Sequence, residues 1–462
     1  MTKTYLFYDI ETTGLNKCFD QILQFAAIRT DLELNELERC NILLKLNPDV
    51  IPSPQAILTH NISVEQTQKG FCEYEAIKKI YQMLNQPETI SLGYNNLSFD
   101  DEFLRFSFYR NLFKPYTHQY ANGCGRMDIY PITIMYYLYK REALKWPELN
   151  GKTSLQLEQI NIVNNLVLGD AHDALIDVEI TLELARHFIM YREMWNYLSS
   201  YFVKQTDLQR IEKLSLALIV DGIFGAEKNY QSIVMFLGWH NHYKNQTLWL
   251  QLDSSQLTTT TLDSVAQTPY IFHKKAGENG LLLPYNTKFS QYLSPERLAL
   301  ATENQKWLEK NPKILAAITD YHKEYKYPII PSLDIDAALY QNGFSSDYEQ
   351  KLCEKFHSLS LKDKSNFISN FSNSKLQMQT IRVLGRNYPE YLPEKYTNNF
   401  KTYLKNIMDG SSAPIDYKNQ KHFTPKEMVT EINELKQRGN LTTKQISLLN
   451  EWCEYIYSLY SL

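Results

Sequence analysis

The fold is decided by one stretch near the start of the chain, residues 6–15, which read LFYDIETTGL. Its aromatic and β-branched residues predict a buried strand, and Gly14 predicts the turn that ends it. Asp9 and Glu11 are two positions apart, so both side chains lie on one face of that strand. Buried carboxylates that stand side by side repel each other, so a fold that keeps them needs a neighbouring cation. An edge strand with a solvated acidic face is the alternative that this pair alone leaves open.

The composition is typical of a soluble globular protein with two or three domains. The chain has 462 residues, of which 44% are hydrophobic and 22% charged, and its net charge is −4. The segment 1–190 holds 17 Lys and Arg against 24 Asp and Glu, an acidic balance that suits a site for cations. No apolar run approaches the roughly 20 residues of a membrane span, and no signal-peptide pattern is present. Six scattered cysteines without paired spacing indicate reduced thiols and a cytoplasmic protein.

Predicted strands and helices alternate over the segment 1–190. The predicted strands are 24–30, 42–46 and 89–94, and the predicted helical segments are 55–59, 64–84, 98–104, 155–160 and one that opens at 169–178. This alternation predicts an α/β domain with a mixed sheet.

The rest of the chain has a different sequence pattern. Short β-like runs at 232–237 and 247–252 predict a small β-rich unit, with a helical insertion around 295–308. From about residue 345 the pattern is helical. Capping-box pairs, Thr424 with Glu427 and Thr442 with Gln445, mark the starts of the last two helices.

Two more groups of candidate site residues follow the acidic strand. Asp100 comes after the predicted strand at 89–94, and His172 and Asp177 stand at the start of a predicted helix. Acidic residues in the first turn of a helix are favoured by the helix dipole, by about 0.3–1 kcal/mol each. When Asp100 or its neighbour Asp101 is considered alone, this effect is sufficient to explain an acidic residue at that position.

The whole set is more specific than its parts. Asp9, Glu11, Asp100, His172 and Asp177 stand in an order that resembles the histidine branch of the DEDD exonuclease superfamily. Shorter members of this branch end soon after the third motif, whereas this chain continues well beyond it, to Leu462.

Further segments narrow the resemblance to the bacterial exodeoxyribonuclease I family. They read FAAIRTD at 25–31, GYNN at 93–96, FDDE at 99–102, YRN at 109–111, IFGA at 223–226, GWH at 238–240 and LYQNGF at 339–344. The resemblance implies an RNase H-like α/β exonuclease domain over residues 1–192, an SH3-like domain over 193–341 and an all-α domain over 342–462. It also implies a channel around single-stranded DNA.

The resemblance implies a two-metal hydrolysis of phosphodiester bonds. Two Mg²⁺ ions, for which Mn²⁺ can substitute, would be held by oxygen ligands. Asp9 would bridge both ions, Glu11 and Asp177 would complete the first, and Asp100 would hold the second. His172 would take the proton of the attacking water. The implied activity is a 3′→5′ exonuclease that releases 5′-mononucleotides stepwise in DNA repair or recombination, and a hydrogen-bonding role at a helix terminus is the alternative for His172.

The implied partners are single-stranded DNA and the C-terminal tail of the single-stranded DNA-binding protein, with the enzyme a monomer away from membranes. Glu11, Arg105, Tyr116, Tyr120 and Gln156 are the implied DNA contacts. Aromatic stacking suits binding without sequence preference, although Tyr116 and Tyr120 also fit a structural core. Gln156 stands where the family can carry an Arg, so one phosphate contact is neutral here.

Two other functions remain open from the residues alone. The first is an exonuclease that trims RNA, against which the long C-terminal part argues. The second is a module that binds single strands without cutting them. A pure binder gains nothing from four carboxylates that face phosphate groups, so the set disfavours this reading.

Overall fold

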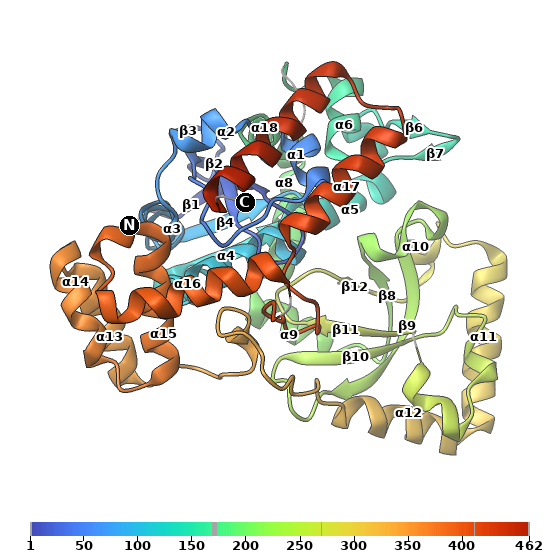
Figure 1. Ribbon diagram of the computed structural model, residues 1–462. Helices are drawn as coiled ribbons and strands as arrows, with labels where there is room; N and C mark the ends of the chain where they lie inside the picture. Colours follow the sequence, from blue (N-terminus) through green and yellow to red (C-terminus); the bar gives the residue numbers. More distant parts are fainter. Residues whose placement is uncertain (1, 169–172, 269, 411, 461–462) are drawn as a thin grey trace.

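The computed structural model describes residues 2–168, 173–268, 270–410 and 412–460. The described residues form a five-stranded sheet with strand order β3-β2-β1-β4-β5. Figure 1 labels β1, β2, β3 and β4 in the blue part of the chain. Its strands are β1 (Thr4–Thr12), β2 (Ile22–Thr30), β3 (Glu36–Leu43), β4 (Thr89–Gly93) and β5 (Gly125–Asp128). β1 pairs antiparallel with β2 and parallel with β4, so the sheet is mixed, as predicted.

Burial explains where these strands run. Every residue of β2 is buried, because helices or other segments cover both faces of the sheet's centre. The predicted third strand is present, but its predicted bounds of 42–46 were wrong, since β3 begins at Glu36 and ends at Leu43. β3 is an edge strand whose first residues are polar and exposed, so its apolar content did not mark its start.

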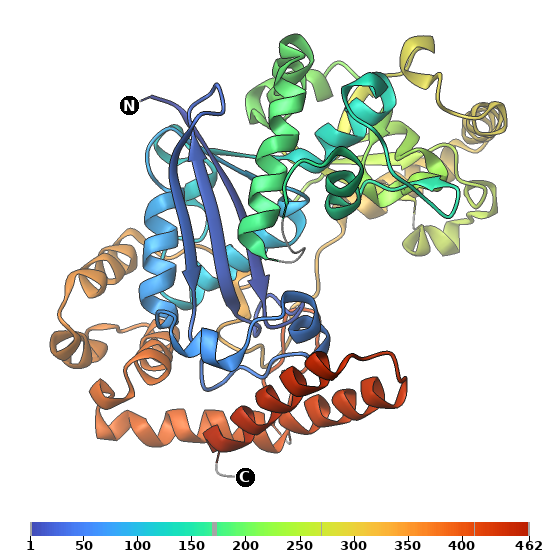
Figure 2. The same ribbon diagram turned by 90° about the horizontal axis from the view of Figure 1, so that it is seen from above.

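The following helices precede the β-rich unit in the chain, and several of them pack against this sheet. They are α1 (Pro54–His60), α2 (Val64–Gln68), α3 (Glu73–Leu84), α4 (Asp100–Arg110), α5 (Ile129–Tyr139), α6 (Leu157–Asn164), α7 (Ala174–Ile189), α8 (Arg192–Ser199) and α9 (Lys204–Ile211), with a small hairpin of β6 (Glu148–Leu149) and β7 (Lys152–Thr153). α7 packs against β1 and β2, and Figure 2 shows it in green running alongside the blue strands.

The next part of the chain is a small β-rich unit, as predicted. Its antiparallel sheet has strand order β11-β10-β9-β8-β12. The strands are β8 (Leu216–Val220), β9 (Gln231–Trp239), β10 (Gln246–Gln251), β11 (Ile271–Lys275) and β12 (Leu281–Pro284), and the helices that follow are α10 (Thr287–Ser290), α11 (Pro295–Lys310) and α12 (Pro312–Glu324). Its classification as SH3-like stays a prediction.

The last part of the chain is helical. Its helices are α13 (Asp347–Ser358), α14 (Leu361–Phe367), α15 (Ser374–Asn387), α16 (Glu394–Asp409), α17 (Pro425–Gln437) and α18 (Thr443–Tyr460). Thr424 caps α17 with the predicted Glu427 partner, and the Thr442 hydroxyl accepts a hydrogen bond from the backbone N–H of Gln445. In Figure 2 the deep orange and red helices lie along one end of the blue strands, and the lighter orange helices lie to one side of the sheet, away from the β-rich unit.

Apolar clusters join these three parts. One cluster brings Ile57 of α1 together with Met428, Ile432 and Trp452 of the last two helices. Another runs from the central sheet into the β-rich sheet, from Phe7 to Leu218 and Leu250. The domain limits 1–192, 193–341 and 342–462 stay a prediction. Among the described residues, no helix has the length and apolar character to span a membrane.

Candidate active site

Three carboxylates meet at the end of β1. Asp9 and Glu11 lie on one face of the strand, and Asp177 lies in the first turn of α7. One carboxylate oxygen from each lies within 4.8 Å of the others, and all three side chains are partly buried. Among the described residues, this is the group of His, Cys, Asp and Glu side chains close enough to hold a metal ion together.

The turn that follows β1 is held by Asp20. Thr13 Oγ1 donates to Asp20 Oδ1 over 2.8 Å, and the backbone N–H of Asn16 donates to Asp20 Oδ2 over 2.8 Å. A Cβ at position 14 would lie 2.5 Å from Asp20 Oδ2, so any other residue there would displace the carboxylate that holds this turn. Burial raises the pKa of Asp20 to about 6. The sequence predicted the turn at Gly14 but not its carboxylate anchor.

The fourth predicted carboxylate, Asp100, begins α4 and is 6% exposed. The chain reaches it through a 3₁₀ turn at Asn96–Ser98, after Asn95 adopts a left-handed conformation with φ 61°. Among the neighbouring charges, that of Asp100 does most to raise the pKa of Asp9. Asp100 therefore stands beside Asp9, on the side of the site formed by β4 and α4.

Burial and repulsion raise the pKa of these acids. Burial and the charges of Asp100, Glu11 and Asp177 raise the pKa of Asp9 well above its ordinary value. Burial and the charges of Asp177 and Asp100 raise the pKa of Glu11 to about 8. The pKa of Asp100 is also raised to about 8, chiefly by burial. A cation placed among these oxygens would remove the repulsion, and an all-carboxylate donor set suits hard divalent ions such as Mg²⁺.

The predicted general base, His172, lies outside the described residues. Its neighbour Asp173 caps α7, where its Oδ1 accepts from the backbone N–H of Leu175 over 2.9 Å. Gln24 Nε2 also donates to Asp173 Oδ1 over 3.3 Å, and Gln24 stands directly opposite Glu11 in the sheet. Gln24 thus links the acidic strand to the helix that carries Asp177. A buried Gln within an apolar strand was the available signal for it.

Three of the predicted DNA contacts lie in the middle of α4 and in the segment that follows it. The Arg105 side chain is 7% exposed, pairs with Asp101, and places its guanidinium 5.8 Å from the centre of the Tyr116 ring. Tyr116 is half-buried and meets the exposed ring of Phe344 edge-on at 5.9 Å. Tyr120 is 70% exposed. Tyr120 is therefore not part of a core, whereas Arg105 is largely committed to Asp101.

Gln156 lies in a separate hollow of about 610 Å³. This hollow also includes Tyr94, Asn95 and Tyr130, which surround the turn leading to α4. Gln156 stands at the N-terminus of α6, with its backbone N–H donated to Ser154 Oγ over 3.3 Å.

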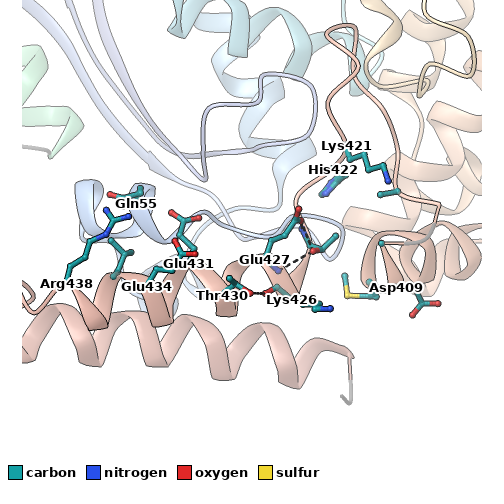
Figure 3. Close-up of a pocket in the computed structure, with 15 residues that line it drawn as sticks. Gln55, Asp409, Lys421, His422, Lys426, Glu427, Thr430, Glu431, Glu434 and Arg438 are labelled. Carbon is teal, nitrogen blue, oxygen red and sulfur yellow. Dashed lines mark hydrogen bonds between the residues drawn. The ribbon is translucent and has the colours of Figure 1, made fainter.

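A larger hollow of about 810 Å³ lies away from the carboxylates, between α1, α17 and the chain around residue 421 (Figure 3). Figure 3 shows Glu427, Glu431 and Glu434 along α17, with Lys421 and His422 above them. Its described lining includes none of the predicted site residues, and its mixed charges fit no step of the chemistry at Asp9 and Glu11.

The comparisons with known proteins agree with this site and fold. Residues 6–185 match the family model described as exonuclease, and residues 333–459 match the one described as exonuclease I C-terminal domain. An acidic site at the end of a mixed sheet, within a matched exonuclease region, defines the chain as an exonuclease.

Individual relatives give the particular family. Exodeoxyribonuclease I of Escherichia coli is 31% identical over 371 residues, which cover 75% of this chain and 78% of that protein. Exodeoxyribonuclease I of Haemophilus influenzae is 25% identical over 480 residues, 98% of each chain. The crystal structure of Escherichia coli exonuclease I in complex with a dA16 oligonucleotide superposes with a TM-score of 0.86 at 25% identity, covering 99% of this chain and 100% of that one. The chain belongs to the exodeoxyribonuclease I family, which confirms the predicted resemblance.

Proposed function

We propose that this protein is a 3′→5′ exonuclease that degrades single-stranded DNA stepwise to 5′-mononucleotides, in DNA repair or recombination. The observation that carries the proposal is the meeting of Asp9, Glu11 and Asp177 within 4.8 Å, with Asp100 beside Asp9, on the scaffold of this family. The related Escherichia coli enzyme has been solved with a dA16 oligonucleotide, which supports a single strand as the substrate here.

Asp9, Glu11, Asp100 and Asp177 would hold two Mg²⁺ ions, for which Mn²⁺ can substitute. When bound, such ions neutralise the charge that develops on the attacking and leaving oxygens of a phosphodiester. Asp9 has a carboxylate oxygen within 4.8 Å of those of Glu11 and Asp177, and the charge of Asp100 also raises its pKa, which supports a role for Asp9 at both ion sites. His172 would accept the proton of the attacking water.

The remaining predicted residues would hold the strand. Tyr120, which is 70% exposed, and the half-buried Tyr116 would stack against bases, since such stacking needs no particular sequence. Arg105 and Gln156 would lie along the same path, and Glu11 would contact the terminal nucleotide. We further propose that the enzyme is a cytoplasmic monomer.

The test is degradation of labelled oligonucleotides of one sequence as single-stranded DNA, duplex DNA and RNA, each with Mg²⁺ or with EDTA. We expect 5′-mononucleotides from single-stranded DNA only, and none with EDTA. A bulky group at the 3′ end should stop their release, whereas faster degradation of RNA, or cutting of circular single strands, would contradict the proposal.

We also propose that the protein binds the C-terminal tail of the single-stranded DNA-binding protein, which rests on the family alone. Calorimetry with the tail peptide at low salt should give measurable heat, reduced by added salt because the peptide is acidic. No heat at micromolar concentrations would dismiss this partner.

A further inference from the structure

Asp128, the last residue of β5, is fully buried and accepts hydrogen bonds on both carboxylate oxygens. Its Oδ1 accepts from the backbone N–H groups of Asn95 over 2.8 Å and of Tyr130 over 2.9 Å. Its Oδ2 accepts from Asn279 Nδ2 over 2.8 Å and from the backbone N–H of Leu97 over 3.5 Å. Asp128 therefore fixes the turn that leads into α4, and one of these donors comes from the β-rich unit.

Asp101, the second residue of α4, is also fully buried and is held from several directions. Its carboxylate pairs with Arg105, with Arg126 over 2.5 Å and with His118 over 2.9 Å. Although burial opposes the effect, the guanidinium groups of Arg126 and Arg105 hold the pKa of Asp101 well below its ordinary value. Arg126 also pairs with Glu278 over 2.5 Å, so a second chain of contacts reaches the β-rich unit.

Both chains of contacts begin in one loop, residues 276–280, which joins β11 to β12. The loop is itself fixed to its own unit. Gly277, with φ 77°, donates its backbone N–H to Asp207 Oδ2 over 2.8 Å. Lys274 Nζ donates to the Glu278 carbonyl over 2.6 Å and pairs with Asp207, and the charged side chains of Lys274 and Asp207 are fully buried. The side chains at 278 and 279 are therefore presented from a firm base.

We propose that Glu278 and Asn279 are positioning residues that hold Asp100 in place for metal binding. Asn279 acts through Asp128 on the turn before Asp100, and Glu278 acts through Arg126 on the residue after it. Asp100 stands beside the like charge of Asp9, so the start of α4 needs such support to keep its carboxylate at the site. Ligand atoms must be held within about 0.5 Å for a site to function. The inference rests on the proposed function, because it takes Asp100 as a metal ligand.

The test is Mn²⁺ binding by isothermal calorimetry to the full-length protein, without DNA. The variant is Glu278→Gln with Asn279→Ala, and each single substitution is measured beside it. The control is Glu227→Gln, because Glu227 forms an exposed ion pair with Lys152 between the same two units, and among the described residues no hydrogen bond or ion pair links this pair to Asp100, Asp101 or Asp128. Substitution of a residue that orients a metal ligand typically weakens metal binding by about 10–100-fold. We expect about tenfold weaker binding of one ion in the double variant and less than twofold change in the control.

A cycle with Asp100→Asn separates positioning from a general loss of structure. In the Asp100→Asn background the loop substitutions should cause no further loss of Mn²⁺ affinity, because the ligand that they position is gone. Equal losses in both backgrounds, or unchanged affinity in the double variant, would overturn the proposal. Saturating Mg²⁺ should restore most of kcat in the double variant. If the wild-type protein binds Mn²⁺ but leaves DNA intact, the proposed function is refuted. The calorimetric comparison of the variants still tests whether Glu278 and Asn279 position Asp100.

Discussion

Glu11→Gln should stabilise the metal-free protein at neutral pH and leave it nearly unchanged at pH 5. In the folded state, burial and the charges of Asp177 and Asp100 raise the pKa of Glu11 from 4.5 to about 8. Between these two pH values the folded protein holds a proton that the unfolded chain has lost. Stability is therefore greatest below pH 4.5, falls as the pH rises, and levels off above pH 8. A glutamine in place of Glu11 carries no charge and avoids this loss.

The magnitude follows from the size of the pKa shift. Each pKa unit corresponds to about 1.4 kcal/mol, so at pH 7 the penalty for Glu11 is about 3 kcal/mol. At pH 5 it is below about 1 kcal/mol by the same conversion.

The assay is urea unfolding in EDTA at pH 5, 6, 7 and 8, followed by tryptophan fluorescence. Wild-type protein is compared with Glu11→Gln and with Glu148→Gln, whose glutamate is exposed in β6. At pH 7, Mg²⁺ at about 1,000 times its Kd should reverse the order, because it contributes about 4.1 kcal/mol to the wild type alone. A difference between wild type and Glu11→Gln that is the same at pH 5 and pH 8 would refute the account of a mutually repelling cluster.

Three further outcomes can be measured. Asp9→Asn and Asp177→Asn should each reduce kcat more than tenfold, which is a barrier increase above about 1.4 kcal/mol. The affinity for single-stranded DNA should stay within a few fold of the wild type. Retained turnover in either variant would show that the substituted residue is not a metal ligand. His172→Ala should lower kcat by about 10²–10⁴-fold with unchanged Mn²⁺ affinity. The loss of kcat should shrink at high pH, where hydroxide replaces the base. Full activity of the variant at pH 7 would exclude His172 as the general base. Burial lowers the pKa of His60 from 6.5 to about 4, so the free energy of unfolding falls as the pH drops below 6.5. In urea unfolding, His60→Asn should reduce the loss of stability between pH 7 and pH 5 by about 2 kcal/mol. An equal loss of stability in both proteins would contradict a buried neutral imidazole.

The central strand and its acids could be predicted because their signals are local. Alternation along a strand fixes which side chains share a face, so Asp9 and Glu11 follow from their spacing alone. Asp100 and Asp177 stand at helix starts that the sequence marks, and the fold brings them to the same end of the sheet. The approach of Asp100 to Asp9 depends on β4 pairing with β1, which no local pattern encodes.

Other elements gave weak or misleading signals. α5 was not predicted, because its sequence IYPITIMYYLY is apolar on nearly every side and has no helical periodicity. β5 is very short, and its last residue, Asp128, resembles an ordinary helix cap. Glu278 and Asn279 lie in a loop whose GENG sequence predicts a turn and nothing about what the turn touches. Residues that act across units far apart in the chain, as Arg126 and Glu278 do, leave no pattern in a single sequence.

The two loops that frame the acids are held by different later parts of the chain. The turn after β1 is tied to the helical part, where Asn16 Nδ2 donates to Asp416 Oδ2 over 3.0 Å. Beside it, the ring of Tyr417 stacks on Phe106 of α4 with centroids 5.8 Å apart. The turn before α4 is tied instead to the β-rich part through Asn279. The strand β1 and the helices α4 and α7 supply the carboxylates, and later segments of the chain supply the contacts that hold the neighbouring loops against mutual repulsion. A domain limited to 1–192 would carry every predicted catalytic residue and lack both of these supports.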